Sequence, residues 1–185
     1  MQRITVAIAE ENGERCAKFE HSLQGEQGIK VLTNVTSNVG EMTVDRRLNP
    51  RTNMSTIDNV VARIRRLNPR ILLANMKLCT EADCAMLVTL RRECPETLVV
   101  LLGDEQAPPE DQVMQALASG ARGYLNIETD SLHLSKSDSL HLSKALYVID
   151  RGEAWLPRKM LGNIMNQVLH WCHGNSTEVH LDPTC

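Results

Sequence analysis

Five short, almost entirely apolar runs recur along this chain, and each is followed by a segment with helical periodicity. The run from Ile71 to Asn75 shows the pattern, because four aliphatic or small residues end in one polar residue. Continuous apolar strands between amphipathic helices are typical of a parallel sheet that helices cover on both faces. The chain is therefore predicted to be an α/β protein with a doubly wound, five-stranded parallel sheet. In such sheets, ligand sites lie at the carboxyl ends of the strands.

The boundaries of these elements follow from periodicity and from residues that begin or end helices. The predicted strands are 4–9, 29–35, 70–75, 98–102 and 122–126. The predicted helices between and after them are 12–23, 57–67, 82–92, 110–119 and 140–150. Asn12 is placed to cap the first helix, and Gly120 and Gly152 are placed to end the last two. Since only 3% of the residues are aromatic, the core must consist mainly of aliphatic side chains.

A repeated heptapeptide interrupts this alternation. The sequence of residues 130–136 recurs, offset by eight positions, at 138–144. Eight residues turn a helix through about 80°, so the two copies cannot present the same face to one core. We interpret 129–137 as an insertion, and the polar segment 36–55 as a second insertion that forms an exposed loop.

The last part of the chain is predicted to form an extra amphipathic helix. Pro157 suits its first turn, and apolar residues then recur at helical spacing. The stripe consists of Met160, Leu161, Ile164, Met165, Val168 and Leu169. It either packs back on the preceding domain or forms an interaction surface for a partner. The predicted organisation is a domain over 1–155, a linker helix over 156–172 and a tail over 173–185.

Composition narrows the function classes. A net charge of −3 and a pI of about 6.1 argue against a generally nucleic-acid-binding surface. A local basic region remains, which either contacts nucleic acid or an acidic partner or is a solvated helix face and loop. Its members are Arg46, Arg47, Arg51, Arg63, Arg65, Arg66 and Arg70. Six cysteines without framework spacing, no leader segment and no run of about 20 apolar residues predict a cytoplasmic protein with reduced thiols and no membrane partner.

Polar residues follow two of the predicted strands at the edge where a site is expected. Glu10 and Glu11 follow the first strand, and Asn75 ends the third. An acidic pair opposite a carboxylate would make a metal-assisted phosphoryl-acceptor site, but the amide of Asn75 has no anionic oxygen. An enzyme that uses these three residues to hold a metal for hydrolysis is an alternative. No general base or cationic clamp accompanies them, so we expect no enzymatic activity.

Two motifs in the second half carry a resemblance to a known family. They are 120–125, Gly-Ala-Arg-Gly-Tyr-Leu, and 152–157, Gly-Glu-Ala-Trp-Leu-Pro. With Pro69 just before the third strand, they make the chain resemble the receiver domain of bacterial response regulators, of the NarL/LuxR subclass, over roughly residues 3–160. The match at 120–157 is close once one copy of the heptapeptide is omitted. The resemblance implies a flavodoxin-like, CheY-like fold.

The resemblance also implies a role for each polar strand end. In the family, two acidic residues after the first strand bind magnesium, and here they are Glu10 and Glu11. The phospho-accepting aspartate ends the third strand, where this chain has Asn75. Glutamates in place of aspartates alter the metal geometry, since magnesium demands a near-octahedral set of ligands. We therefore expect no cofactor, or at most weak magnesium binding.

The other positions that would sense a phosphoryl group are also altered. Gly103 stands where the family has a hydroxyl residue, and Ile127 where it has a lysine. Tyr124 occupies the place of the family's switch aromatic. Phosphoryl transfer needs an in-line nucleophile and positive charge on the equatorial oxygens, so these losses predict a degenerate phosphorylation site.

The resulting expectation is an atypical receiver domain that is not switched by aspartyl phosphorylation. It would act in two-component signalling through contacts with a protein partner or as a homodimer, using the surface around Tyr124 and the 160–169 stripe. The alternative is the regulatory part of a NarL/LuxR-type transcription regulator, in which DNA is bound only through a helix-turn-helix module absent from this chain.

Overall fold

The computed structural model describes residues 3–36, 56–103, 108–127 and 134–174. They form a five-stranded sheet in the order β2-β1-β3-β4-β5, in which all neighbouring strands are parallel. The strands are β1 Ile4–Ala9, β2 Ile29–Asn34, β3 Ile71–Asn75, β4 Leu98–Gly103 and β5 Ala121–Asn126. The helices are α1 Gly13–Gln24, α2 Thr56–Leu67, α3 Met76–Glu93, α4 Glu110–Ala118, α5 Lys136–Asp150 and α6 Arg158–Gly174. The predicted doubly wound fold class is confirmed.

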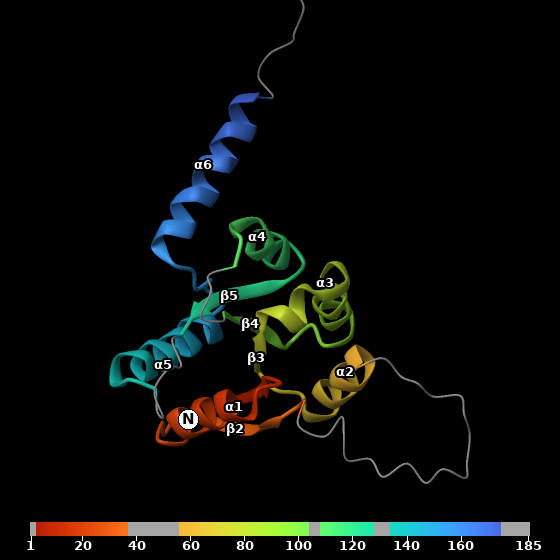
Figure 1. Cartoon of the computed structure of the whole chain (residues 1–185), viewed down its shortest axis with the longest axis vertical. Helices are drawn as coiled ribbons and strands as arrows, with labels where there is room; N and C mark the ends of the chain where they lie inside the picture. The colour runs from red at the N-terminus through yellow and green to blue at the C-terminus, as the bar shows by residue number, and fades with distance from the viewer. Residues whose placement is uncertain (1–2, 37–55, 104–107, 128–133, 175–185) are drawn as a thin grey trace, which may run out of the picture. The chain divides into compact units, whose positions relative to one another are not determined.

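Helices cover both faces of the sheet. Helices α1 and α5 pack on one face, and α2, α3 and α4 line the other (Figure 1). Alternate strand residues supply each core, because successive side chains of a strand point to opposite faces. On the α1–α5 side, Val6, Ile71 and Val100 pack with Phe19 and Leu146. Among the described residues, Phe19 and Tyr124 are the buried aromatic side chains of a core that is mainly aliphatic, as the composition predicts.

Two helices, α3 and α5, begin several residues earlier than the sequence predicts. Helix α3 starts at Met76 instead of residue 82, because the Asn75 side chain caps it and accepts a hydrogen bond from the Lys77 backbone N–H. A break then follows at residues 81–84, where Ala82, Asp83 and Cys84 adopt positive φ angles of 47°, 55° and 61°. Helix α5 starts at Lys136 instead of residue 140, capped by Ser135. Local side-chain capping therefore extends both helices beyond their periodic apolar stretches.

The predicted insertions fall largely outside the described residues. Of the segment 36–55, only Thr36 is described, and of 129–137 only residues 134–137 are. The chain divides into two compact units, Met1–Trp155 and Leu156–Cys185. In the second unit, α6 runs to Gly174, two residues beyond the end predicted for the linker helix, and 175–185 of the predicted tail are not described.

All six residues of the predicted stripe lie in α6. Leu161, Met165 and Leu169 are about half exposed, at 49%, 54% and 51%. Ile164 is half-buried and Met160 is buried, while the side chain of Val168 lies outside the described part. Three large apolar side chains at i, i+4 and i+8 thus leave one side of this helix accessible.

Candidate functional site: the carboxyl edge of the sheet

Three adjacent strands end together at the edge where the sequence predicts a site. The pairing of β1 with β3 and of β3 with β4 brings the ends of these strands together. Glu10 directly follows β1, Asn75 is the last residue of β3, and Gly103 is the last residue of β4. The structure therefore brings Glu10, Asn75 and Gly103 together at one edge of the sheet.

Glu10 is buried, with an exposed fraction of 1%. The Asn75 side-chain N–H2 group donates to both of its carboxylate oxygens, at 3.1 Å each. The Asn12 backbone N–H donates to Oε1 at 3.0 Å. A buried carboxylate is stable only when hydrogen bonds or an opposite charge replace its water shell, and these contacts supply part of that replacement.

The opposite charge comes from Arg15, in the first turn of α1. Its Nη1 lies 3.4 Å from Glu10 Oε2, and its Nη2 donates to the Gly103 carbonyl at 2.6 Å. The guanidinium carbon also lies 5.7 Å from the centre of the Phe19 ring. Since Arg15 is only 8% exposed, this is a buried ion pair that joins α1 to the ends of β1 and β4.

The amide at position 75 is chemically matched to this arrangement. Its Oδ1 accepts from the Lys77 backbone N–H at 2.8 Å, which turns its N–H2 group toward Glu10. An aspartate here would offer no donor to Glu10 and would place a second negative charge against it. Asn75 therefore works as a structural donor and helix cap, and its amide nitrogen is not a nucleophile.

The two predicted metal ligands have different surroundings. Glu10 is enclosed by Asn75, Asn12 and Arg15, whereas Glu11 is exposed. Within the described ranges, no group of three or more His, Cys, Asp or Glu side chains could hold a metal ion. Magnesium requires several oxygen ligands in octahedral geometry, while here a guanidinium already neutralises the buried carboxylate. The residues present do not fit a magnesium site of the predicted kind.

The Tyr124 ring occupies the space next to Gly103. A Cβ added to Gly103 would lie in contact with the Tyr124 hydroxyl and 2.8 Å from Cζ of the ring. Tyr124 is 3% exposed, so its ring fills the space that a side chain at position 103 would need. No residue with a side chain, including serine and threonine, fits at this strand end while Tyr124 keeps its position.

Ile127 is a core residue. It is 3% exposed and packs in the cluster beneath α1 and α5, with Leu125 and Leu142 among its members. Its neighbour Asn126 is exposed. A lysine at this position would have to leave the core or bury its charge, so the position predicted to carry the family's cation is used for packing.

Cys16 is the nearest thiol on α1, one residue after Arg15. Burial, together with the neighbouring Glu20 carboxylate, raises the pKa of Cys16 to about 12. The thiol is therefore protonated at neutral pH and does not replace the missing nucleophile.

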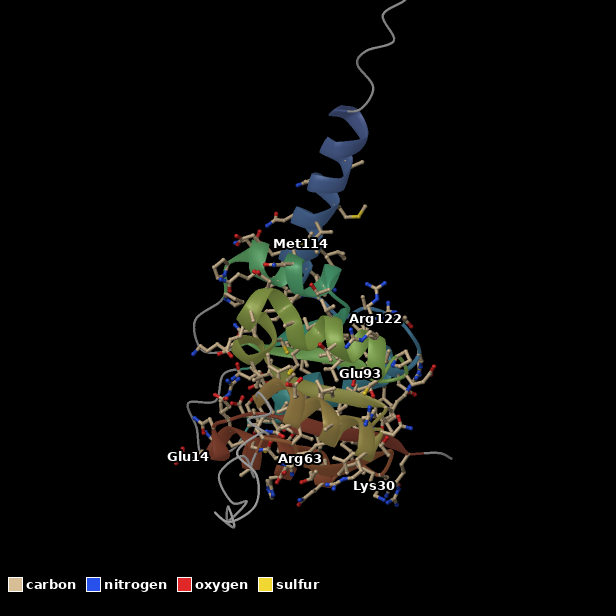
Figure 2. The ribbon with its side chains drawn as sticks, turned by 90° about the vertical axis from the view of Figure 1, so that its right-hand side faces the viewer. Glu14, Lys30, Arg63, Glu93, Met114 and Arg122 are labelled. Atoms are coloured by element: carbon tan, nitrogen blue, oxygen red, sulfur yellow. The ribbon has the colours of Figure 1, made fainter. Side chains whose placement is uncertain are left out.

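Three of the four described arginines of the basic region contact other residues of the domain. Arg63, labelled in Figure 2, donates to the Val35 carbonyl at 2.9 Å. Arg70 forms an ion pair with Asp150 at 2.8 Å. Arg65 lies 3.8 Å from Glu93, whereas Arg46, Arg47 and Arg51 lie outside the described residues. The contacts of Arg63, Arg65 and Arg70 thus lie within the domain.

Arg15 is the site residue that sequence reasoning missed, since the predicted site had no cation. A signal was available in the helix pattern. Arg15, Phe19 and Leu23 recur at i, i+4 and i+8, and all three are buried on one face of α1. An arginine on the apolar face of a helix next to an acidic strand end indicates a buried ion pair.

No protein-family model and no curated protein sequence matches the chain. Solved structures do. A LuxR-family two-component response regulator from Aurantimonas sp. SI85-9A1 aligns with a TM-score of 0.64 at 11% identity, over 91% of this chain and 99% of that one. The isolated REC domain of RcsB from Salmonella enterica serovar Typhimurium, solved with the phosphomimetic BeF3−, aligns with a TM-score of 0.57 at 12% identity, over 86% and 96%.

The non-phosphorylated receiver domain of RcsB from Escherichia coli is a third similar structure. It aligns with a TM-score of 0.55 at 15% identity, over 85% of this chain and 100% of that domain. In the described residues, no helix is both long and apolar enough to span a membrane. The strand order, the helix layers and these alignments together show that the chain has the fold of response-regulator receiver domains.

Proposed function

We propose that this chain is an atypical receiver domain of a two-component system, acting in the cytoplasm through protein–protein contacts and not switched by aspartyl phosphorylation. The observation that supports the proposal is the set of contacts made by the Glu10 carboxylate. Both of its oxygens are engaged by the Asn75 amide, and one also by the Arg15 guanidinium. The Glu10 carboxylate would have to bind the metal, and the side chain at position 75 would have to accept the phosphoryl group. Instead these two groups are hydrogen-bonded to each other.

The chemistry of phosphoryl transfer explains why the contacts among Glu10, Asn75 and Arg15 are incompatible with switching by phosphorylation. The reaction needs an in-line oxygen nucleophile, together with cations that neutralise the developing charge on the phosphoryl oxygens. Asn75 has an amide in place of an oxygen nucleophile. The Arg15 guanidinium pairs with Glu10 and donates to the Gly103 carbonyl. Ile127 is in the core. These residues have no step to perform in such a transfer, so we assign no enzymatic activity to the site.

The Gly103–Tyr124 pair supports a fixed conformation. Tyr124 is buried against Gly103, and Arg15 holds the carbonyl of that same glycine. Two separate contacts therefore restrain the end of β4. We propose that the signalling surface around β5 has one constitutive form, controlled by the presence of a partner instead of by phosphate.

The partner surfaces that we assign are the face formed by α4, β5 and α5, and the α6 stripe. The receiver domain would comprise 1–155, and α6 would carry its output contact. Support for the second surface is the exposure of Leu161, Met165 and Leu169, because large apolar side chains in a row favour burial against another helix. A protein partner and a second copy of the chain are both compatible with this stripe.

The proposal is tested by treating the full chain with acetyl phosphate, and separately with beryllofluoride, in the presence of Mg2+. We expect no covalent adduct by intact-mass spectrometry and no saturable change in the 1H–15N amide spectrum. The Salmonella RcsB receiver, whose structure was solved with BeF3−, serves as the positive control under the same conditions. A phosphoryl adduct on the wild-type chain would refute the proposal.

A second candidate is the regulatory part of a DNA-binding transcription regulator. The similarity to a LuxR-family regulator and the presence of α6 after the receiver fold favour it. In that case DNA would be bound through a helix-turn-helix module that is not in this sequence. A longer reading frame encoding such a module would support this candidate. Direct DNA binding by this chain that weakens steeply with salt would also favour it.

A further inference from the structure

A cavity of about 280 Å³ lies at the opposite edge of the sheet from Glu10. It is bounded by the ends of α3 and α4 and by the first residues of β4 and β5. Its apolar wall includes Leu87, Val99 and Ala121, which are 1%, 4% and 6% exposed. These side chains are almost wholly buried beneath the cavity, whose exposed lining is mainly polar.

Two arginines line the same cavity, Arg91 at the end of α3 and Arg122 in β5, and no acidic residue lines it. Within the described part of the chain, neither guanidinium has an ion pair, in contrast to Arg65, Arg70 and Arg92. Figure 2 faces the α2–α4 side, and the labelled Arg122 lies there beside α3 and below α4. Both arginines are exposed, and their positive charges would attract an anion at the cavity.

The backbone holds both arginines at the cavity. Gly120 has a φ of 125°, a conformation that favours glycine, and the Cδ atom of Arg91 lies 3.5 Å from the position a Cβ of Gly120 would take. The Arg91 side chain thus lies along the bare backbone of Gly120. The Arg122 carbonyl accepts from the Trp155 N–H at 3.2 Å, which anchors the other arginine's backbone.

We propose that this cavity binds a compact anion that carries carboxylate or phosphate groups. Guanidinium groups form paired, charge-assisted hydrogen bonds with both kinds of anion. The cavity volume lies just below the range typical of ligand sites, so the proposed anion is small. The proposal does not depend on the proposed function, because it uses none of the residues at the Glu10 edge.

The test is titration of the full chain, followed by the amide signals of Gly120, Ala121 and Leu98. The probes are glutarate for the carboxylate arm, inorganic phosphate for the phosphate arm, and glutaramide as the uncharged analogue of glutarate. We expect saturable shifts with at least one anion at a dissociation constant on the order of 1–10 mM, as two partly exposed ion pairs allow. Glutaramide should bind at least about fivefold more weakly, because it lacks the charge.

The variants Arg91→Gln and Arg122→Gln should each weaken binding by about threefold to tenfold. Arg92→Gln is the matched control, since Arg92 is the next residue of α3, is exposed and does not line the cavity. Folding of each variant is checked from its amide spectrum. Equal loss in Arg91→Gln and Arg92→Gln, or no saturable binding of either anion at 50 mM, would overturn the proposal. Selective binding of an acidic peptide at these arginines, without binding of either small anion, would overturn it also.

Discussion

At the scale of single residues, Arg15 is the side chain on which the edge of the sheet depends. It is 8% exposed and neutralises Glu10, which is 1% exposed. Removing one member of a buried pair leaves the other charge without compensation. We expect Arg15→Met to lower the free energy of unfolding by about 3 kcal/mol, measured by urea denaturation at pH 7.

The double variant Glu10→Gln with Arg15→Met tests whether the loss comes from the charge. It should be more stable than Arg15→Met alone, because a neutral amide replaces the uncompensated carboxylate. Arg92→Met is the control, since the ion pair between Arg92 and Glu93 is exposed and should contribute less than about 1 kcal/mol. A change below that size in Arg15→Met would contradict a stabilising role for the buried pair.

At the scale of elements, the break within α3 is the least regular feature of the fold. Ala82, Asp83 and Cys84 have positive φ angles, which strain residues with a Cβ. We expect Ala82→Gly to leave stability unchanged or raise it by up to about 1 kcal/mol, because the strain is relieved. Ala85→Gly, in the regular part of the same helix, should lower it by about 1 kcal/mol. Thermal unfolding of the two variants measures the contrast, and a destabilised Ala82→Gly would mean that this turn is not strained.

At the scale of the whole molecule, α6 is the segment that we expect to control assembly. Charge on its exposed stripe should weaken any helix–helix contact that it makes. If the chain forms a homodimer, Leu161→Glu with Met165→Glu should shift its mass from dimer to monomer in size-exclusion chromatography with light scattering. Val88→Glu on α3 is the matched control, since Val88 is 55% exposed but lies on another helix. An unchanged dimer in the α6 variant would contradict assembly through this stripe.

The arrangement of strands and helices was readable from the sequence alone. Continuous aliphatic runs and helical periodicity predicted all five strands and the helices between them, and strand ends marked Glu10 and Asn75. Gly103 was singled out by the family resemblance. These features are local, since each is set by residue types over one element. The early start of α3 was missed because it depends on a single capping side chain, Asn75, and not on periodicity.

Tertiary structure alone decided how the strand ends are used. Arg15 contacts both Glu10 and the Gly103 carbonyl because α1 packs against the sheet. Arg15 and Gly103 are 88 positions apart in the sequence. That Tyr124 takes the space beside Gly103 follows from the pairing of β4 with β5. Residue types determine which elements form, whereas contacts between distant residues depend on how those elements pack, and only the folded chain specifies that packing.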